Sequence, residues 1–154
     1  MMQRLRELLE QDEGCVYSVY LDSLDKPTLG IGHLIVEDDP EYGWPVGAPV
    51  SEERVAELFE QDVQVAINDA RWLHPELDDM PEDAQITIIS LAFQLGMPRY
   101  SKFVKHHAAI ELPSPTRWKE AAAELRDSKL YRQTPQRTER HAQRLENIAC
   151  TTAI

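Results

Sequence analysis

All of the strand-type patterning in this 154-residue chain lies in one short stretch near the N-terminus. Residues 17–22 alternate apolar and polar side chains, turn-forming residues follow, and a second short run covers residues 28–31. Alternation on both sides of a turn predicts a small antiparallel hairpin. From Ser51 onward, apolar residues instead recur every three or four positions, as in helices. The pattern therefore predicts an α+β fold with its strands gathered at one end.

The chain around this hairpin is predicted to complete a small N-terminal β lobe over about residues 15–50. Leucines at spacings of three and four predict a first helix over residues 2–13, which Gly14 ends in the left-handed conformation. Residues 37–50 are rich in proline and glycine, so we expect a loop or an edge strand there.

A long helix over about residues 51–72 is predicted to connect the β lobe to a mainly helical lobe over about residues 73–150. Ser51 is suited to cap this helix, which at about 20 residues would be near 30 Å long. The apolar periods between proline-containing breaks predict further helices over residues 83–95, 100–109, 116–128 and 136–149.

Charge and composition exclude several classes of function. Sixteen basic against 27 acidic residues leave a net charge of −11, which argues against binding to a nucleic-acid backbone. No apolar run approaches the roughly 20 residues of a membrane span, and the N-terminus lacks the apolar core of a signal peptide. Cys15 and Cys150 show no metal-binding spacing, so free thiols are expected, with a disulfide between them as the alternative.

Two carboxyl groups and a hydroxyl group follow one another at the start of the chain. Cleavage of a glycosidic bond needs one protonated and one ionised carboxyl group on opposite sides of the bond. Glu13, on the last turn of a helix and beside apolar residues, is in a position that disfavours its charged form. Asp22 at a solvated turn is expected to stay ionised, and Thr28 to bring its hydroxyl beside Asp22 and hold the attacking water. The three groups would converge only if the hairpin folds onto the end of the first helix.

This part of the sequence resembles the phage-type lysozymes typified by the T-even bacteriophage enzyme. The residues that carry the resemblance are Glu13-Gly14, Tyr20-x-Asp22 and Thr28-x-Gly30-x-Gly32-His33. Further matches in the family's order are Leu58-Phe59-x-Gln61-Asp62, Phe93-Gln94-Leu95-Gly96, Arg117-Trp118 and Tyr131-x-Gln133-Thr134-Pro135-x-Arg137. The resemblance implies a lysozyme-like fold in which residues 1–154 form a single domain and the first helix packs with the C-terminal lobe.

The activity that the resemblance implies is that of a muramidase, which hydrolyses the β-1,4 bond between N-acetylmuramic acid and N-acetylglucosamine in peptidoglycan. Glu13 would be the general acid, and Asp22 and Thr28 would position the water of an inverting reaction. Leu34, Phe93 and Gln94 would bind the substrate. In supporting positions, His33 would pair with Asp62, and Arg137 would lie near Glu13.

By the same resemblance, no metal and no organic cofactor takes part, and the partner is bacterial peptidoglycan. The protein would be a monomer that leaves the host cytoplasm through a holin, or part of a virion in contact with other virion or tail proteins. The alternatives are a non-catalytic tail or wall-binding component with a lysozyme fold, and a chitinase-like glycosidase.

Four features do not follow directly from this interpretation. The acidic net charge is unfavourable for an enzyme that acts on an anionic cell wall. Tyr42 and Trp44 are equally compatible with a sugar-stacking platform and with packing in the β lobe. Adjacent His106 and His107 are interpreted as packing or surface residues, because neighbouring helical side chains diverge. The acidic stretches over residues 37–39 and 76–83 lack the residue order of a calcium-binding loop and are interpreted as solvated faces.

Overall fold

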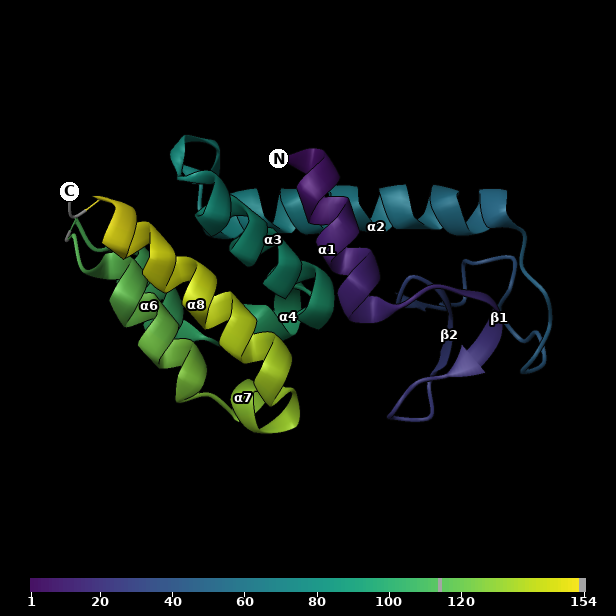
Figure 1. Ribbon diagram of the computed structural model, residues 1–154. Helices are drawn as coiled ribbons and strands as arrows, with labels where there is room; N and C mark the ends of the chain where they lie inside the picture. Colours follow the sequence, from purple (N-terminus) through teal and green to yellow (C-terminus); the bar gives the residue numbers. More distant parts are fainter. Residues whose placement is uncertain (114, 153–154) are drawn as a thin grey trace. The chain divides into compact units, whose positions relative to one another are not determined.

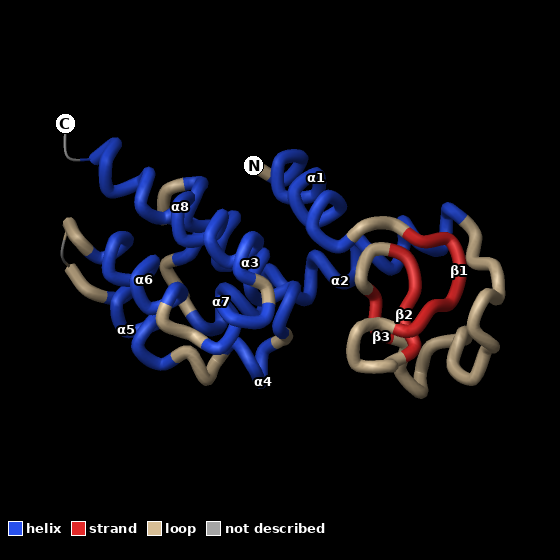
Figure 2. Tube along the Cα trace, turned by 60° about the horizontal axis from the view of Figure 1, so that its bottom comes forward, coloured by secondary structure: helices blue, strands red, loops and turns tan. Residues whose placement is uncertain are grey.

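The computed structural model describes the backbone of residues 1–113 and 115–152, with their side chains as far as residue 148. The chain divides into two compact units, Met1–Val65 and Ala66–Ile154. The first unit contains a three-stranded antiparallel sheet, and the second contains helices (Figures 1 and 2). The predicted α+β fold class is confirmed. The proposed packing partner of the first helix stays a prediction.

The elements of the first unit are α1 (Met2–Glu13), β1 (Val16–Leu21), β2 (Pro27–Gly30), β3 (His33–Leu34) and the first part of α2 (Glu52–Leu73). Helix α1 has the predicted bounds. Gly14 follows it with φ 73° and ψ 178°, and its N–H donates to the carbonyl of Glu10 at 2.9 Å. The positive φ agrees with the prediction, but the extended ψ leads the chain out of the helix directly into β1.

The sheet has the order β1-β2-β3, and its third strand is short (Figure 2). Tyr20 of β1 lies opposite Thr28 of β2, and Leu29 of β2 lies opposite His33 of β3. The hairpin was predicted, whereas β3 was not, because two residues are too few to show a period. An isolated bridge between Ser18 and Pro49 brings the proline-rich loop alongside β1, as expected for a segment that completes this sheet.

Helix α2 begins after Ser51, whose Oγ accepts a hydrogen bond from the backbone N–H of Arg54 at 3.1 Å. This is the predicted cap. Glu52 and Glu53 lie in the first turn, where the helix dipole favours negative charge. The helix has 22 residues; it starts in the first unit and ends in the second.

The second unit is built around α3 (Glu82–Leu95), of which nine of 14 residues are buried. A helix that is apolar on all sides belongs in a core. Helix α8 (Pro135–Thr152) packs on α3 and on α6 (Arg117–Arg126), beside which it runs in Figure 1. The remaining elements are η1 (Leu77–Asp79), α4 (Met97–Tyr100), α5 (Val104–Glu111) and α7 (Lys129–Gln133).

The helix predicted over residues 100–109 is wrong in one respect, because the chain breaks at residues 101–103 and forms α4 and α5 instead. Tyr100 is fully buried, and its hydroxyl lies 3.0 Å from Nε2 of His106. Residues six apart in one helix do not share a face, so this contact requires the break. The packing of one aromatic ring therefore overrides the local helical pattern.

Two sequence expectations concern the whole chain. Cys15 is a free cysteine, as expected, and the side chain of Cys150 lies outside the described residues. Among the described residues, no helix combines the length and the apolar character needed to span a membrane.

Candidate active site

Glu13 is the last residue of α1, and its carboxyl group lies against the backbone of Gly32, in the turn between β2 and β3. A Cβ placed on Gly32 would stand 2.8 Å from Oε2 of Glu13 and 3.1 Å from its Cδ. Gly32 also has φ 67°, which favours glycine. The second glycine of the Gly-x-Gly-His sequence therefore leaves the space that the Glu13 carboxyl group occupies.

Asp22 closes the turn between β1 and β2. Its Oδ1 accepts hydrogen bonds from the backbone N–H groups of Leu24 at 2.8 Å and Lys26 at 2.9 Å. Its own N–H donates to the carbonyl of Lys26 at 3.0 Å. These bonds orient the carboxylate, and among the described residues both side-chain bonds end on the same oxygen. The second oxygen is left to meet water or a ligand.

Thr28 is 4% exposed, and its hydroxyl group donates to the carbonyl of Lys26 at 2.9 Å. This hydroxyl was expected beside Asp22, and that placement stays a prediction. Both side chains bind the same residue, because Asp22 accepts from the N–H of Lys26 and Thr28 donates to its C=O. Since the only hydrogen of the hydroxyl is engaged, Thr28 can act toward any further partner only as an acceptor.

Tyr20 lies in β1, and no role was predicted for it. Burial raises the pKa of Tyr20, and the negative charges of Glu13 and Asp22 raise it further. Tyr20 is also the cross-strand partner of Thr28, so the two side chains lie on the same face of the sheet. Its position two residues before Asp22 is the feature of the sequence that could have identified Tyr20 as a residue of this site.

His33 lies between two carboxylates. Its Nδ1 is 2.7 Å from Oδ2 of Asp62, which is the expected contact, and its Nε2 is 2.8 Å from Oδ2 of Asp39. Burial acts to lower the pKa of His33, but the hydrogen bonds to Asp62 and Asp39 outweigh it and raise the pKa. The second partner was missed, because the acidic run over residues 37–39 was interpreted as a solvated face.

The other site residues predicted from the resemblance lie on several elements. Leu34, in β3, is 45% exposed. Phe93 and Gln94 lie on the last turns of α3, and Arg137 lies on the first turn of α8. Nε2 of Gln94 lies 3.4 Å from Oγ1 of Thr134, which places Gln94 beside the start of α8. Their roles toward Glu13 and toward a substrate stay predictions.

Tyr42 and Trp44 both have exposed side chains in the loop that follows β3. Exposed rings do not fit the alternative in which the two residues fill a β-lobe core. They leave two aromatic faces available to a ligand, in the stretch of sequence where the resemblance is weakest.

His106 and His107 differ in their surroundings. His106 is fully buried and lies 3.1 Å from the carbonyl of Ala121, so it is a packing residue, as expected. His107 belongs to a hydrogen-bonded chain with His74 and the carbonyl of Tyr100. The contact with His74, 33 positions away in the sequence, was not predicted.

Comparison with known proteins gives consistent similarities. The family model described as Phage lysozyme matches residues 10–142. A probable T4-type lysozyme 2 of Dictyostelium discoideum is 30% identical, over 91% of this chain and 92% of its own length. The pre-baseplate central spike protein Gp5 of Enterobacteria phage T4 is 29% identical over 88% of this chain and 26% of its own. The peptidoglycan hydrolase gp36 of Pseudomonas phage phiKMV is 30% identical over 91% of this chain and 15% of its own.

Proposed function

This chain belongs to the phage lysozyme family, and from that premise we propose that it is a muramidase that hydrolyses the β-1,4 bond between N-acetylmuramic acid and N-acetylglucosamine in bacterial peptidoglycan. The observation that carries the proposal is that α1 and the hairpin after it hold all three groups. Glu13 lies against Gly32 in the turn between β2 and β3, and Asp22 and Thr28 both hydrogen-bond to Lys26. Two carboxyl groups at one site are what the hydrolysis of a glycosidic bond requires.

In the proposed reaction, Glu13 donates its proton to the glycosidic oxygen as the bond to the anomeric carbon breaks. A water molecule attacks this carbon from the opposite face, and Asp22 accepts the proton that the water loses. The water forms the new bond directly, so the configuration at the anomeric carbon is inverted. No covalent sugar–enzyme intermediate is needed.

The hydrogen bonds of Thr28 support its part in this reaction. Its hydroxyl hydrogen is engaged by the carbonyl of Lys26, so a water beside it must donate to Oγ1. If the other hydrogen of that water points to the carboxylate of Asp22, a lone pair is left for the anomeric carbon. Thr28 and Asp22 together would fix the orientation of the nucleophile. Such positioning is a large part of catalysis in a two-reactant step.

The substitution Glu13→Gln tests the acid. Glutamine keeps the shape of the side chain but has no proton to supply, so reducing-end release from purified peptidoglycan is expected to fall by about 10²-fold or more. The unfolding temperature should stay the same or rise. Glu10→Gln, an exposed change on the same helix, is the matched control and should leave the rate unchanged. More than about 1% residual activity in Glu13→Gln would remove Glu13 as the acid.

The same assay separates the alternatives. A chitinase-like enzyme would release reducing ends from chitin at least as fast as from peptidoglycan. A non-catalytic wall-binding component would sediment with cell walls and release reducing ends from neither polymer. Asp22→Asn keeps an acceptor for the two turn amides, so the fold should persist while the reaction loses its base.

The biological setting is proposed from the relatives. Similarity to the central spike protein Gp5 of phage T4 favours a virion-associated enzyme, which would contact other virion or tail proteins. The other setting is a lysis enzyme that stays in the host cytoplasm until a holin releases it to the wall. Mass spectrometry of purified virions would decide, because only the first setting predicts the protein in intact particles.

A further inference from the structure

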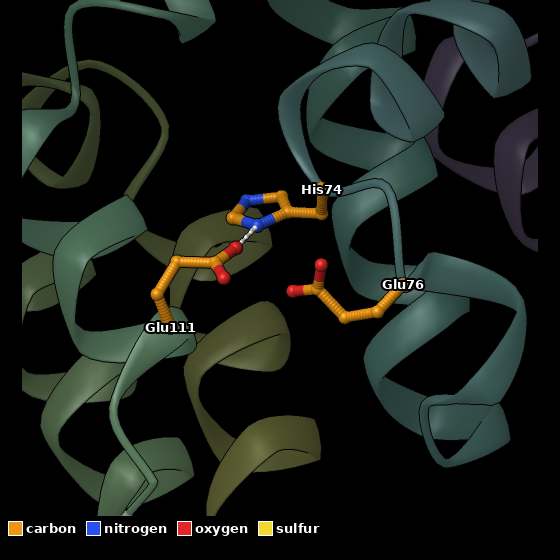
Figure 3. Close-up of side chains that lie close together, drawn as sticks. All are labelled: His74, Glu76 and Glu111. Atoms are coloured by element: carbon orange, nitrogen blue, oxygen red, sulfur yellow. Dashed lines mark hydrogen bonds and ion pairs between the residues drawn. The ribbon is translucent and has the colours of Figure 1, made fainter.

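Three side chains of the helical unit converge at a place remote in sequence from Glu13, Asp22 and Thr28. His74 follows α2 directly, Glu76 precedes η1, and Glu111 is the last residue of α5. Each offers one ligand-type atom, and these atoms all lie within 4.8 Å of one another. Figure 3 shows the carboxylates of Glu76 and Glu111 both turned toward the ring of His74. This cluster plays no part in the proposed hydrolysis.

The hydrogen bonds from His74 to His107 and from His107 to the carbonyl of Tyr100 indicate which nitrogen of His74 faces the two carboxylates. Nε2 of His107 lies 2.8 Å from the carbonyl of Tyr100, which can only accept, so this nitrogen carries a hydrogen. The other nitrogen of His107 lies 2.8 Å from Nε2 of His74. The tautomer of His107 with its hydrogen on Nε2 has an acceptor at Nδ1, so Nε2 of His74 donates to it. Nδ1 is then the nitrogen of His74 that faces Glu111.

Two carboxylates and one imidazole nitrogen meet at one place. Nδ1 of His74 is in close contact with Oε1 of Glu111, and the Glu76 carboxylate lies beside both. Two carboxylates this close to one another are stabilised by a positive charge between them. A metal ion would supply that charge and bind all three atoms at once.

We propose that His74, Glu76 and Glu111 bind a divalent transition metal ion of the zinc type. One imidazole nitrogen and two carboxylate oxygens are ligands that Zn²⁺ accepts, with water in the fourth position. Ca²⁺ and Mg²⁺ prefer oxygen ligands throughout, so the imidazole disfavours them. The side chain of Glu111 is 48% exposed, which gives the ion and a water molecule access from solvent.

Three further features fit this assignment. The imidazoles that bind metals usually donate their second N–H to a protein acceptor, and Nε2 of His74 does so toward His107. The side chain of His74 has no exposed surface, so its nitrogen is held in place while the carboxylates adjust around the ion. The net charge of −11 also raises the local concentration of cations.

The bound ion would connect two parts of the helical unit. His74 and Glu76 lie at the end of α2 and the turn after it, and Glu111 lies 37 residues after His74 at the end of α5. A ligand that binds only the folded chain stabilises it in proportion to its affinity and concentration. We therefore expect the ion to support the structure rather than the reaction.

The test uses the full chain, freed of metal by a chelator, titrated with Zn²⁺ by calorimetry and followed by thermal unfolding. One tight site and a higher unfolding temperature are expected. Glu76→Gln and Glu111→Gln should each weaken Zn²⁺ binding by roughly tenfold or more, without lowering the unfolding temperature of the metal-free protein. Glu120→Gln, an exposed change on α6, should bind Zn²⁺ like the parent. These variants avoid the buried His74, whose replacement could prevent folding.

Binding through cysteine is a separate explanation for any Zn²⁺ uptake. Co²⁺ in place of Zn²⁺ should give a spectrum without a thiolate charge-transfer band, and the variant with Cys15→Ser and Cys150→Ser should bind as tightly as the parent. The proposal is overturned if Zn²⁺ produces neither heat nor a thermal shift. It is also overturned if both glutamine variants bind Zn²⁺ as the parent does, or if they lose stability without metal, as a simple His74–Glu111 ion pair would require.

Discussion

The carboxyl group of Glu13 packs against the α-carbon of Gly32, so that a side chain at position 32 would collide with it. The two residues are brought together by the exit of the chain from α1 and by the turn between β2 and β3. Gly32 is thus needed for two reasons, its positive φ and the room that it leaves for Glu13. These two reasons can be separated by experiment.

Gly32→Ala should lower kcat/KM on peptidoglycan by roughly 10²-fold, because a methyl group there displaces the Glu13 carboxyl group. Gly43→Ala is the matched control, since Gly43 also has a positive φ but nothing lies within 4 Å of its added Cβ. Both variants should lose about 1 kcal/mol of stability from backbone strain. Equal activity losses in the two would show that strain, and not the contact with Glu13, is responsible.

Thr28→Val should lower kcat by about 10²-fold, because valine keeps the shape but offers no oxygen to the attacking water. Thr28→Ser keeps the hydroxyl and should retain most of the activity. Loss of the bond to the carbonyl of Lys26 should cost Thr28→Val about 1 kcal/mol, measured by urea unfolding. Full activity in Thr28→Val would exclude the proposed role in holding the water.

Asp62→Asn should destabilise the protein at pH 5.5 by roughly 1.5–3 kcal/mol, the range for hydrogen bonds to charged groups. The pKa of His33 is raised in the folded state, so its contribution is fully present below its ordinary pKa of 6.5 and is lost as the pH rises through the folded value. The difference between variant and parent should therefore shrink at pH 9. Asp38→Asn, a change at an exposed neighbouring residue, should show no such dependence.

Asp39, the second partner of His33, sets a lower pH limit to the stability that the charged His33 contributes. Burial acts to raise its pKa, but the hydrogen bonds from the N–H of Val36 and from His33 outweigh it and lower the pKa. Its contribution is present above its ordinary pKa of 3.8 and is lost as the pH falls through the folded value.

If the free energy of unfolding of Asp62→Asn equalled that of the parent at every pH, the hydrogen bond between His33 and Asp62 would not contribute to stability.

The release of products from intact cell walls should increase by roughly tenfold between about 0.01 M and 0.2 M salt. The reason is the net charge of −11, which repels an anionic wall at long range until salt screens it. A neutral chito-oligosaccharide is the control substrate, and its cleavage should not depend on salt. A flat profile on intact walls would mean that the surface charge does not limit access to the wall.

Much of the β lobe could be predicted because its signals are local. The alternation around the hairpin, the glycine after α1 and the Ser51 cap each depend on residues a few positions apart. The spacing of Glu13, Asp22 and Thr28 was likewise readable, since α1 and one hairpin carry all three. The break in the helix at residues 101–103 could not be predicted from the sequence, because it depends on the burial of Tyr100.

Contacts between residues distant in sequence could not be derived from local patterns. His33 and Asp62 are 29 positions apart, and only the resemblance to the family predicted their contact. His74 and Glu111 are 37 positions apart, and their contact was not predicted. No local period indicates such pairs, because they form only when chain folding closes the loops between them. The sequence alone thus sufficed for most of the elements and for the order of the proposed catalytic groups, but not for β3 or for the break between α4 and α5. Which side chain meets which, including the second carboxylate on His33 and the histidine–glutamate cluster, followed only from the packed chain.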